Sequence, residues 1–250
     1  GSAPNFLKLL AHDLRWKMLT LLARSDYNGQ EFMRLLGQPQ NLISYHLRKL
    51  HEQHLVTEHR STADERAIYY SLNLETVRSL YQQAGSALHP ALASGFEVPA
   101  YPKILQSEPR RVLFLCTENS ARSQMAEATL RYLSQGHIQV SSAGSQPTTI
   151  HPLALQTLKS HGLEIEGLRA KSIDEFSGQA FDSIITVCDR VRELCPTFPG
   201  DPEHIHWSLA DPAQTQGSLE ERSEAFEQIF LQLTTRIRFL LLLPEQQQRR

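Results

Sequence analysis

Val112-Leu-Phe-Leu-Cys116-Thr-Glu-Asn-Ser-Ala-Arg122-Ser123 joins an apolar run to a cysteine, a short polar loop and an arginine. The helical pattern Met125-Ala-Glu-Ala-Thr-Leu-Arg-Tyr-Leu133 follows it directly. This order predicts a strand, a tight loop and a helix, which together direct loop amides and the positive helix end at one place. Such a place favours a tetrahedral oxyanion, and the planar fork of Arg122 can bind two of its oxygens. The stretch therefore predicts an anion site.

Cys116 lies at the edge of this predicted anion site. A free thiol titrates near pH ~8.5, but a helix amino terminus and a nearby arginine can lower that pKa to about 4–7. We therefore expect a thiolate at neutral pH, which would act as a nucleophile on a bound anion. The alternative is a structural cysteine that ends a core strand. The strand before it, the helix after it and the adjacent Arg122-Ser123 pair favour catalysis.

Residues 116–128, Cys-Thr-Glu-Asn-Ser-Ala-Arg-Ser-Gln-Met-Ala-Glu-Ala, resemble the phosphate-binding loop of low-molecular-weight protein tyrosine phosphatases and of the arsenate reductases that share their fold. The resemblance covers roughly residues 110–243. It implies that Cys116 is the nucleophile, Arg122 the oxyanion clamp and Ser123 a hydroxyl that steadies the thiolate. The implied anion-binding loop comprises Thr117, Glu118, Asn119, Ser120 and Ala121. Glu118 stands where the family commonly has glycine.

An Asp-Pro pair at residues 211–212 matches the general-acid loop of the same family. The resemblance implies that Asp211 protonates the leaving oxygen, a role worth typically ~10²–10⁴ in rate. The alternative is a simple turn, because Asp-Pro is a common turn dipeptide.

The rest of the second half alternates predicted strands and helices. We expect strands at 138–141 and 183–187, and helices at 152–161 and 219–242. Alternation predicts a parallel sheet with helices on both faces and ligands at the carboxyl ends of its strands. The expected fold is therefore α/β, and the resemblance implies a flavodoxin-like parallel sheet of the low-molecular-weight phosphatase type.

Two further cysteines, Cys188 and Cys195, follow the strand expected at 183–187. The alternative to a redox role is a core Cys188 and an incidental Cys195. With this pair the resemblance narrows to thioredoxin-coupled arsenate reductases. It implies that Cys116 attacks arsenate, that Cys188 attacks Cys116 and releases arsenite, and that Cys195 then attacks Cys188. Thioredoxin would reduce the resulting disulfide, with no bound cofactor. Lys171 lies near where some reductases use a carboxylate for potassium, so we expect no potassium requirement.

The first part of the chain predicts a separate α+β domain, a winged helix-turn-helix. Helical spacing recurs at 6–22, 30–36, 41–54 and 74–88, and strands at 55–60 and 67–72 flank a polar hairpin tip. The helix at 41–54 leaves amide, hydroxyl and basic side chains for solvent, which suit base edges and phosphates. With two wing arginines, the candidate DNA-binding residues are Gln40, Asn41, Ser44, Tyr45, Arg48, Lys49, Arg60 and Arg66. The alternative is an ordinary helical hairpin with a solvated face.

Residues 43–56, Ile-Ser-Tyr-His-Leu-Arg-Lys-Leu-His-Glu-Gln-His-Leu-Val, and residues 68–73, Ile-Tyr-Tyr-Ser-Leu-Asn, resemble the winged-helix domain of ArsR-type repressors. The resemblance spans about residues 4–92. It implies a homodimer that binds operator DNA and associates through the helices at 6–22 and 74–88. Arsenic-sensing members carry a cysteine pair before the turn, whereas residues 1–115 here contain no cysteine. A thiol sensor inside this domain is therefore excluded.

A stretch with proline and glycine separates the two halves, so we expect domains at 4–92 and 110–243 with a linker at 93–109. The 25 basic and 27 acidic residues give a net charge of −2, so DNA contact needs a local basic patch. No apolar run approaches the ~20 residues of a membrane-spanning helix. Three cysteines suit a reducing cytoplasm. The eleven histidines show no convergent ligand spacing, so we expect no metal site.

Three functions follow from these features. The first is reduction of arsenate to arsenite, fused to a DNA-binding regulator of arsenic resistance. The second is a protein tyrosine phosphatase that uses the same anion loop. The third is a redox- or arsenite-responsive repressor whose C-terminal thiols are the sensor. Cys188 and Cys195 favour the first over the second.

Overall fold

The computed structural model describes residues 4–64, 66–89, 110–193 and 196–242. The chain divides into two compact units, Gly1–Pro99 and Ala100–Arg250, and each has its own apolar core. The linker predicted at 93–109 and the candidate relay residue Cys195 lie outside the described residues. Within the described ranges, no helix is long and apolar enough to cross a membrane.

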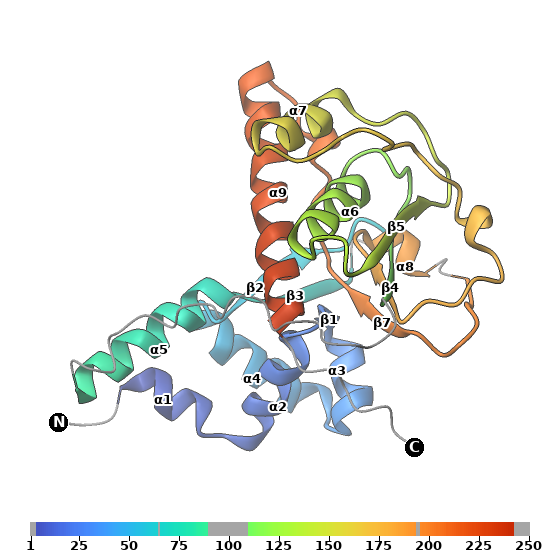
Figure 1. Cartoon of the computed structure of the whole chain (residues 1–250). Coiled ribbons are helices and arrows are strands. Elements are labelled where there is room, and N and C mark those ends of the chain that lie inside the picture. The colour runs from blue at the N-terminus through green and yellow to red at the C-terminus, as the bar shows by residue number, and fades with distance from the viewer. Residues whose placement is uncertain (1–3, 65, 90–109, 194–195, 243–250) are drawn as a thin grey trace. The chain divides into compact units, whose positions relative to one another are not determined.

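The N-terminal unit is a winged helix-turn-helix, as predicted (Figure 1). Its helices are α1 (Asn5–Leu10), α2 (Asp13–Leu22), α3 (Gly29–Leu36), α4 (Gln40–Glu52) and α5 (Leu74–Leu88). Its strands are β1 (Tyr27–Asn28), β2 (Val56–Arg60) and β3 (Ile68–Leu72), which form an antiparallel sheet in the order β1-β3-β2. The hairpin of β2 and β3 is the wing, and β1 is a strand that the sequence did not predict.

Two local signals set the start and end of α3. The Asn28 side chain accepts a hydrogen bond from the Glu31 amide, and the Glu31 carboxylate accepts one from the Asn28 amide. This reciprocal cap satisfies two N–H groups that a helix start otherwise leaves unpaired. Gly37, with φ of +63°, ends the helix in the left-handed conformation that glycine adopts without strain. The turn to α4 follows.

The single helix predicted at 6–22 is wrong. α1 ends at Leu10, and α2 begins at Asp13 after a new cap, in which the His12 ring accepts a hydrogen bond from the Leu14 amide at 3.2 Å. The apolar spacing continues through the break because both helices bury their apolar side chains in the same core. Periodicity alone therefore could not locate this boundary.

The C-terminal unit is built on a four-stranded parallel sheet in the order β5-β4-β6-β7. The strands are β4 (Arg111–Cys116), β5 (Gln139–Gly144), β6 (Ser183–Thr186) and β7 (Glu203–His206). The helices are α6 (Arg122–Leu133), α7 (Pro152–Ser160), α8 (Asp189–Glu193) and α9 (Leu219–Leu242), with short 3-10 helices η2 (Ile173–Phe176) and η3 (Pro212–Gln214). This topology confirms the predicted α/β fold.

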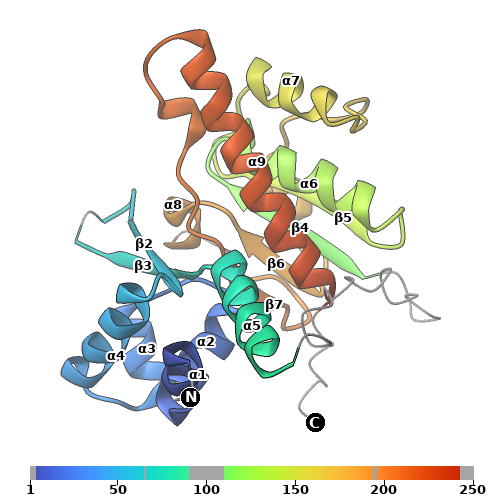
Figure 2. The same ribbon diagram turned by 90° about the vertical axis from the view of Figure 1, so that its left-hand side faces the viewer.

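The interior position of β4 explains its sequence. It pairs with β5 on one side and β6 on the other, so Val112 to Cys116 are all buried. Figure 2 shows α6 and α9 side by side over the sheet, and Phe226, Leu233 and Ile237 of α9 are fully buried. Because β4 and β6 are parallel, their carboxyl ends meet at one edge, where Cys116 and Cys188 are both buried.

Candidate functional site

The loop between β4 and α6 surrounds the Cys116 sulfur. The Asn119 amide donates to Cys116 Sγ at 3.1 Å, and Ser123 Oγ lies 2.8 Å from the same sulfur. The Asn119 side chain also donates to Ser123 Oγ at 2.8 Å. Ser123 therefore accepts from Asn119 and can direct its own proton at the sulfur, the arrangement that stabilises a thiolate.

A neighbouring segment orients the loop peptides. The amides of Gln146, Thr148 and His151 donate to the carbonyls of Thr117, Glu118 and Ser120 at 2.8, 3.0 and 2.9 Å. In a planar trans peptide the C=O and N–H groups point in opposite directions. The loop carbonyls are thus held outward, and the N–H groups are left for the interior, as an anion site requires. Sequence reasoning did not identify residues 146–151.

Asn119 joins the loop to the helix and to the sheet. It is fully buried with φ of +50°, a left-handed conformation that asparagine tolerates better than most residues. Its side chain donates to Ser123 and Ser142, each at 2.8 Å, and its Oδ1 accepts from Gln124 and from the Lys171 amide, each at 2.8 Å. Asn119 is therefore the residue that fixes the loop conformation.

Gly144, at the end of β5, leaves room for this loop. A Cβ atom at Gly144 would lie 2.6 Å from the Thr117 carbonyl oxygen and 2.8 Å from the Asn119 amide nitrogen. Both are backbone atoms that cannot rotate away. Any larger residue at Gly144 must displace the loop.

The rim of the loop carries the unusual Glu118. Glu118 is exposed, and its carboxylate accepts a hydrogen bond from Ser120 Oγ at 3.2 Å. Ser120 and Ala121, by contrast, are buried. The negative charge of Glu118 thus lies at the solvent side of the loop.

The pKa of Cys116 departs from the prediction. Burial raises the pKa of this thiol above its ordinary value, and the neighbouring Cys188 sulfur raises it further. Arg122, the Ser123 hydroxyl and the Asn119 amide lower it, but by less. The sequence predicted a lowered pKa, whereas burial outweighs the three contacts that lower it, because the sulfur is more completely desolvated than its sequence position indicated. The nucleophile is the thiolate fraction that these three contacts stabilise.

Replacing Ser123 tests the contacts that oppose this rise. Ser123→Ala should raise the pKa of Cys116 further, because it removes a hydrogen bond that stabilises the thiolate. Less thiolate would then form at a given pH, so alkylation by iodoacetamide should slow below the thiol pKa and recover at high pH. The measurement is the alkylation rate of Cys116 against pH.

The control is Ser134→Ala, which removes a buried serine hydroxyl from the turn that follows α6. An unchanged midpoint in Ser123→Ala, or an equal shift in Ser134→Ala, would show that the Ser123 hydroxyl does not stabilise the thiolate.

Arg122 and Asp211 are brought together at the mouth of the site. Arg122, 8% exposed, donates to the Leu209 carbonyl at 2.9 Å, and its second terminal nitrogen lies 3.0 Å from Asp211 Oδ2. Asp211 Oδ1 also accepts from the Ala213 amide, which caps η3. Asp211, which the sequence indicated as the general acid, therefore contacts Arg122 of the anion loop.

Cys188 is the second thiol at this site. Cys188 lies two residues after Thr186, the last residue of β6, and is 2% exposed. Its Sγ lies 3.4 Å from Thr117 Oγ1 in the anion loop. Both Cys116 and Cys188 are free thiols. The third candidate, Cys195, lies outside the described residues.

A buried polar network beneath the loop was missed by sequence reasoning. Glu127 on α6 accepts from Ser142 Oγ at 2.6 Å and from Lys171 Nζ at 3.0 Å, and it also pairs with Arg131. Lys171 Nζ further donates to the Arg169 carbonyl at 3.1 Å. Gln124 and Glu127 could have indicated this network, because they are polar residues in a helix that is buried over its first nine residues. Buried charges and polar groups need partners.

The candidate DNA-binding face lies in the N-terminal unit. On α4, Gln40, Asn41, Ser44, Tyr45 and Arg48 are exposed, while Ile43, Leu47 and Leu50 are buried, as the spacing predicted. Lys49 pairs with Glu52 at 3.1 Å, and in the wing Arg66 Nε lies 3.5 Å from Asp64. Arg60 is exposed at the end of β2. Their contact with DNA stays a prediction.

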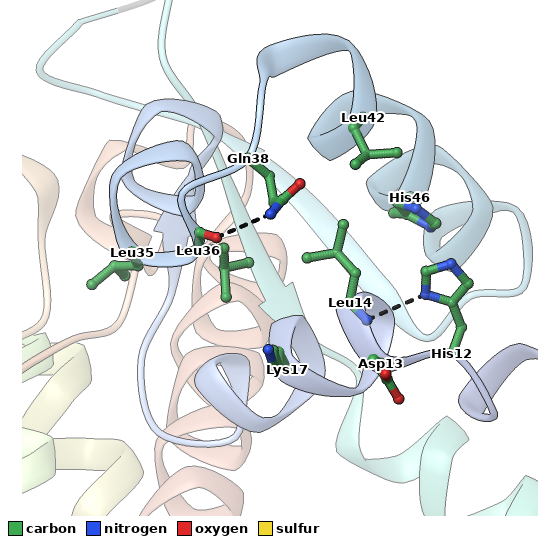
Figure 3. Close-up of a pocket in the computed structure, with 9 residues that line it drawn as sticks. All are labelled: His12, Asp13, Leu14, Lys17, Leu35, Leu36, Gln38, Leu42 and His46. Carbon is green, nitrogen blue, oxygen red and sulfur yellow. Dashed lines mark hydrogen bonds between the residues drawn. The ribbon is translucent and has the colours of Figure 1, made fainter.

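A pocket in the same unit, shown in Figure 3, receives side chains from α2, α3 and α4 and from the turn after α3. His46 is buried there with its ring centroid 4.4 Å from that of His12. Burial lowers the pKa of His46, and His12 and Arg15 lower it further, so the neutral ring is favoured. Nowhere in the described ranges do three or more His, Cys, Asp or Glu residues converge as a metal site.

Comparisons with known proteins agree with both units. The family described as low molecular weight phosphotyrosine protein phosphatase matches residues 111–249, and the bacterial regulatory protein, ArsR family, matches residues 12–58. The first match covers more than half of the chain. The chain thus belongs to the low molecular weight phosphotyrosine protein phosphatase family and carries an ArsR-family helix-turn-helix domain at its N-terminus.

Within this family the chain is similar to proteins named arsenate reductases. An arsenate reductase of Halalkalibacterium halodurans is 33% identical over 127 residues, which are 51% of this chain and 91% of that protein. A glutaredoxin arsenate reductase of Synechocystis sp. is 31% identical over 123 residues, 46% of this chain and 94% of that protein. A solved arsenate reductase in the phosphate binding state is 28% identical, with a TM-score of 0.44, and covers 53% of this chain and 97% of that one.

Proposed function

We propose that this protein reduces arsenate to arsenite by a relay of Cys116, Cys188 and Cys195. The observation that carries the proposal is the second buried thiol: Cys188 Sγ lies against the anion loop, 3.4 Å from Thr117 Oγ1. A phosphatase has no use for a thiol at this place. The similarity to proteins named arsenate reductases supports the same activity.

The relay begins with the Cys116 thiolate attacking arsenic of bound arsenate. An As–S bond forms, and an arsenate oxygen leaves as water after protonation, for which Asp211 is the candidate acid through its position beside Arg122. Arg122 and the loop amides hold the remaining oxygens. Because arsenic is still As(V) in this adduct, a reducing step must follow.

The Cys188 thiolate supplies that step by attacking Cys116 Sγ. The S–S bond forms while the electrons of the As–S bond pass to arsenic, so arsenite, As(III), is released and two thiols are oxidised. Cys195 then attacks Cys188 and frees Cys116 as a thiolate. The Cys188–Cys195 disulfide is reduced by an external dithiol, for which we propose thioredoxin; glutaredoxin is the alternative that the name of the Synechocystis relative indicates.

The test is arsenite formation from arsenate by the full-length protein, measured directly, with NADPH and either thioredoxin plus thioredoxin reductase or glutaredoxin plus glutathione and its reductase. We expect continuous arsenite production with thioredoxin. Production with glutaredoxin alone would correct the reductant, whereas no arsenite in either mixture would refute the reductase.

A second candidate is a protein tyrosine phosphatase. The contact between Arg122 and Asp211 favours it, because the same clamp and acid suit phosphoryl transfer, and the family match names this activity. The two functions differ in their need for Cys188: arsenate reduction requires this thiol, whereas phosphate hydrolysis does not.

We also propose that the N-terminal domain binds operator DNA as a homodimer, with α4 in the major groove and the wing on the backbone. The ArsR-family match and the exposed polar face of α4 support this proposal. A cytoplasmic location accompanies it as a prediction.

Arg48→Ala should weaken binding to a DNA sequence selected from a random pool by about 5- to 150-fold, since a lost contact is worth ~1–3 kcal/mol. The matched control is Arg238→Ala, an exposed arginine on α9 of the C-terminal unit. Fluorescence anisotropy at fixed salt gives both affinities. Equal affinities of Arg48→Ala and the unaltered protein would refute the assignment of α4.

Regulation of DNA binding by the C-terminal thiols is the third candidate, since residues 1–115 contain no cysteine. If the thiols are the sensor, reduced, oxidised and arsenite-treated protein should differ in affinity for the same selected DNA. Identical affinity in all three states would exclude this function.

Lys171 bears on potassium dependence. Its ammonium lies 3.0 Å from Glu127 in the network beneath the loop, where it supplies a fixed positive charge. We therefore expect arsenate turnover to be the same in potassium and sodium salts at equal ionic strength. A marked stimulation by potassium would contradict this expectation.

A further inference from the structure

Behind Cys188 lies a cluster of buried polar side chains that the relay does not use. Asp189 Oδ1 accepts from Ser208 Oγ at 2.8 Å and lies 3.1 Å from His206 Nε2. The other ring nitrogen of His206 lies 2.8 Å from Thr186 Oγ1. All four residues are at most 5% exposed, among the apolar residues Val187, Val191, Trp207 and Leu209.

Such a cluster is costly to bury, and apolar residues of similar volume often stabilise a core at least as well. Buried polar networks are more useful for fixing one particular geometry, because each member has few alternative partners. We therefore expect this cluster to fix the geometry of the segments that carry it.

The cluster fixes the amino end of α8. Asp189 is the first residue of this helix and directly follows Cys188, while Thr186 and His206 end the paired strands β6 and β7. A helix of five residues is too short to persist without tertiary contacts. The contacts of Asp189 thus tie α8, and with it Cys188, to the rigid edge of the sheet.

The relay makes two opposing demands on this helix. Cys188 must stay beside the anion loop until it reacts. It must then bond with a cysteine seven positions along the chain. The five residues of α8 lie between the two cysteines and span about 7.5 Å as a helix, whereas a disulfide needs Cα atoms within about 4.4–6.8 Å. α8 must therefore hold before the reaction and unwind after it.

We propose that Asp189 is a positioning residue of the relay, which His206 holds so that α8 stays wound and Cys188 stays buried until Cys116 has reacted. The inference rests on the proposed relay for its purpose, and on the buried contacts of Asp189 for its geometry. Asp189 takes no chemical part in the relay. It acts through the placement of Cys188.

Asp189→Asn is the direct test, because asparagine keeps an acceptor for Ser208 Oγ and loses the charge that faces His206. His206→Phe tests the same contact from the other side and keeps an aromatic ring in the core. The matched controls make the same changes at exposed positions of the same two elements, Glu193→Gln on α8 and His204→Phe on β7.

The first readout is alkylation of Cys188 by iodoacetamide, quantified by peptide mass spectrometry with saturating inorganic phosphate to occupy the anion loop. Alkylation requires α8 to open, so its rate reports the opening equilibrium. We expect it to rise about 10- to 100-fold in Asp189→Asn and His206→Phe, the effect of one lost charge-assisted hydrogen bond. Neither control should change it.

The second readout compares two activities. Hydrolysis of an aryl phosphate needs the anion loop but not Cys188, so it should be unchanged, while kcat for arsenate should fall. An unchanged alkylation rate in both variants, or an equal loss of both activities, would overturn the proposal. If the unaltered protein reduces no arsenate but the alkylation rates still differ, the relay is wrong and the anchoring role of Asp189 stands. Failure of one variant to fold leaves the other to decide.

Discussion

Cys188→Ser should form the arsenic adduct on Cys116 and release no arsenite, while it still hydrolyses an aryl phosphate at the unaltered rate. Cys116, Arg122 and the loop contacts are intact in this variant, so the first attack proceeds. The As–S bond then has no thiol to break it, because Cys188 is the only other described thiol at the loop. Turnover ends after one event per protein.

Cys195→Ser is the matched variant, because it changes the same atom one step later. It should release one equivalent of arsenite and stop as the Cys116–Cys188 disulfide. The amount of arsenite released per protein therefore distinguishes the variants. We expect none from Cys188→Ser and one equivalent from Cys195→Ser. If Cys188→Ser turns over arsenate continuously, the relay is refuted.

Arg122→Lys should reduce kcat for aryl phosphate and for arsenate together, by about 10²–10³, the usual cost of removing one oxyanion donor. Lysine keeps the charge but presents a point donor in place of a planar fork. It also cannot hold the Leu209 carbonyl and Asp211 at once, which Arg122 does at 2.9 and 3.0 Å. Both activities should fall because both use the same anion loop.

The control for this variant is Arg190→Lys, an exposed arginine on α8 assayed with aryl phosphate. It should keep the unaltered rate. A loss in Arg122→Lys confined to KM would instead mean that Arg122 binds the ground state and the transition state equally.

Much of the fold and of the candidate site follows from the sequence because the decisive features are local. The strand, loop and helix around Cys116 are specified by one continuous stretch, and α5 has the predicted bounds because its apolar spacing is regular and Asn73 caps its start. The exposed and buried faces of α4 follow from the same periodicity. Fold class was therefore accessible without coordinates.

The remainder depends on contacts between distant segments. Asn119 reaches Ser142 and Lys171, and Asp189 reaches His206, over separations that no periodic pattern reports. The pKa of Cys116 was predicted in the wrong direction for the same reason. The motif indicates that Arg122 lies near the sulfur. The degree of desolvation of the sulfur depends instead on the packing of the whole sheet edge.

A single-turnover experiment tests the relay most directly. Fully reduced protein is mixed with excess arsenate without any external reductant, quenched by alkylation, and analysed for arsenite and for disulfides by mass spectrometry. The relay predicts one arsenite per protein, the loss of two thiols and a Cys188–Cys195 disulfide with Cys116 alkylated. Three alkylated thiols and no arsenite would contradict it.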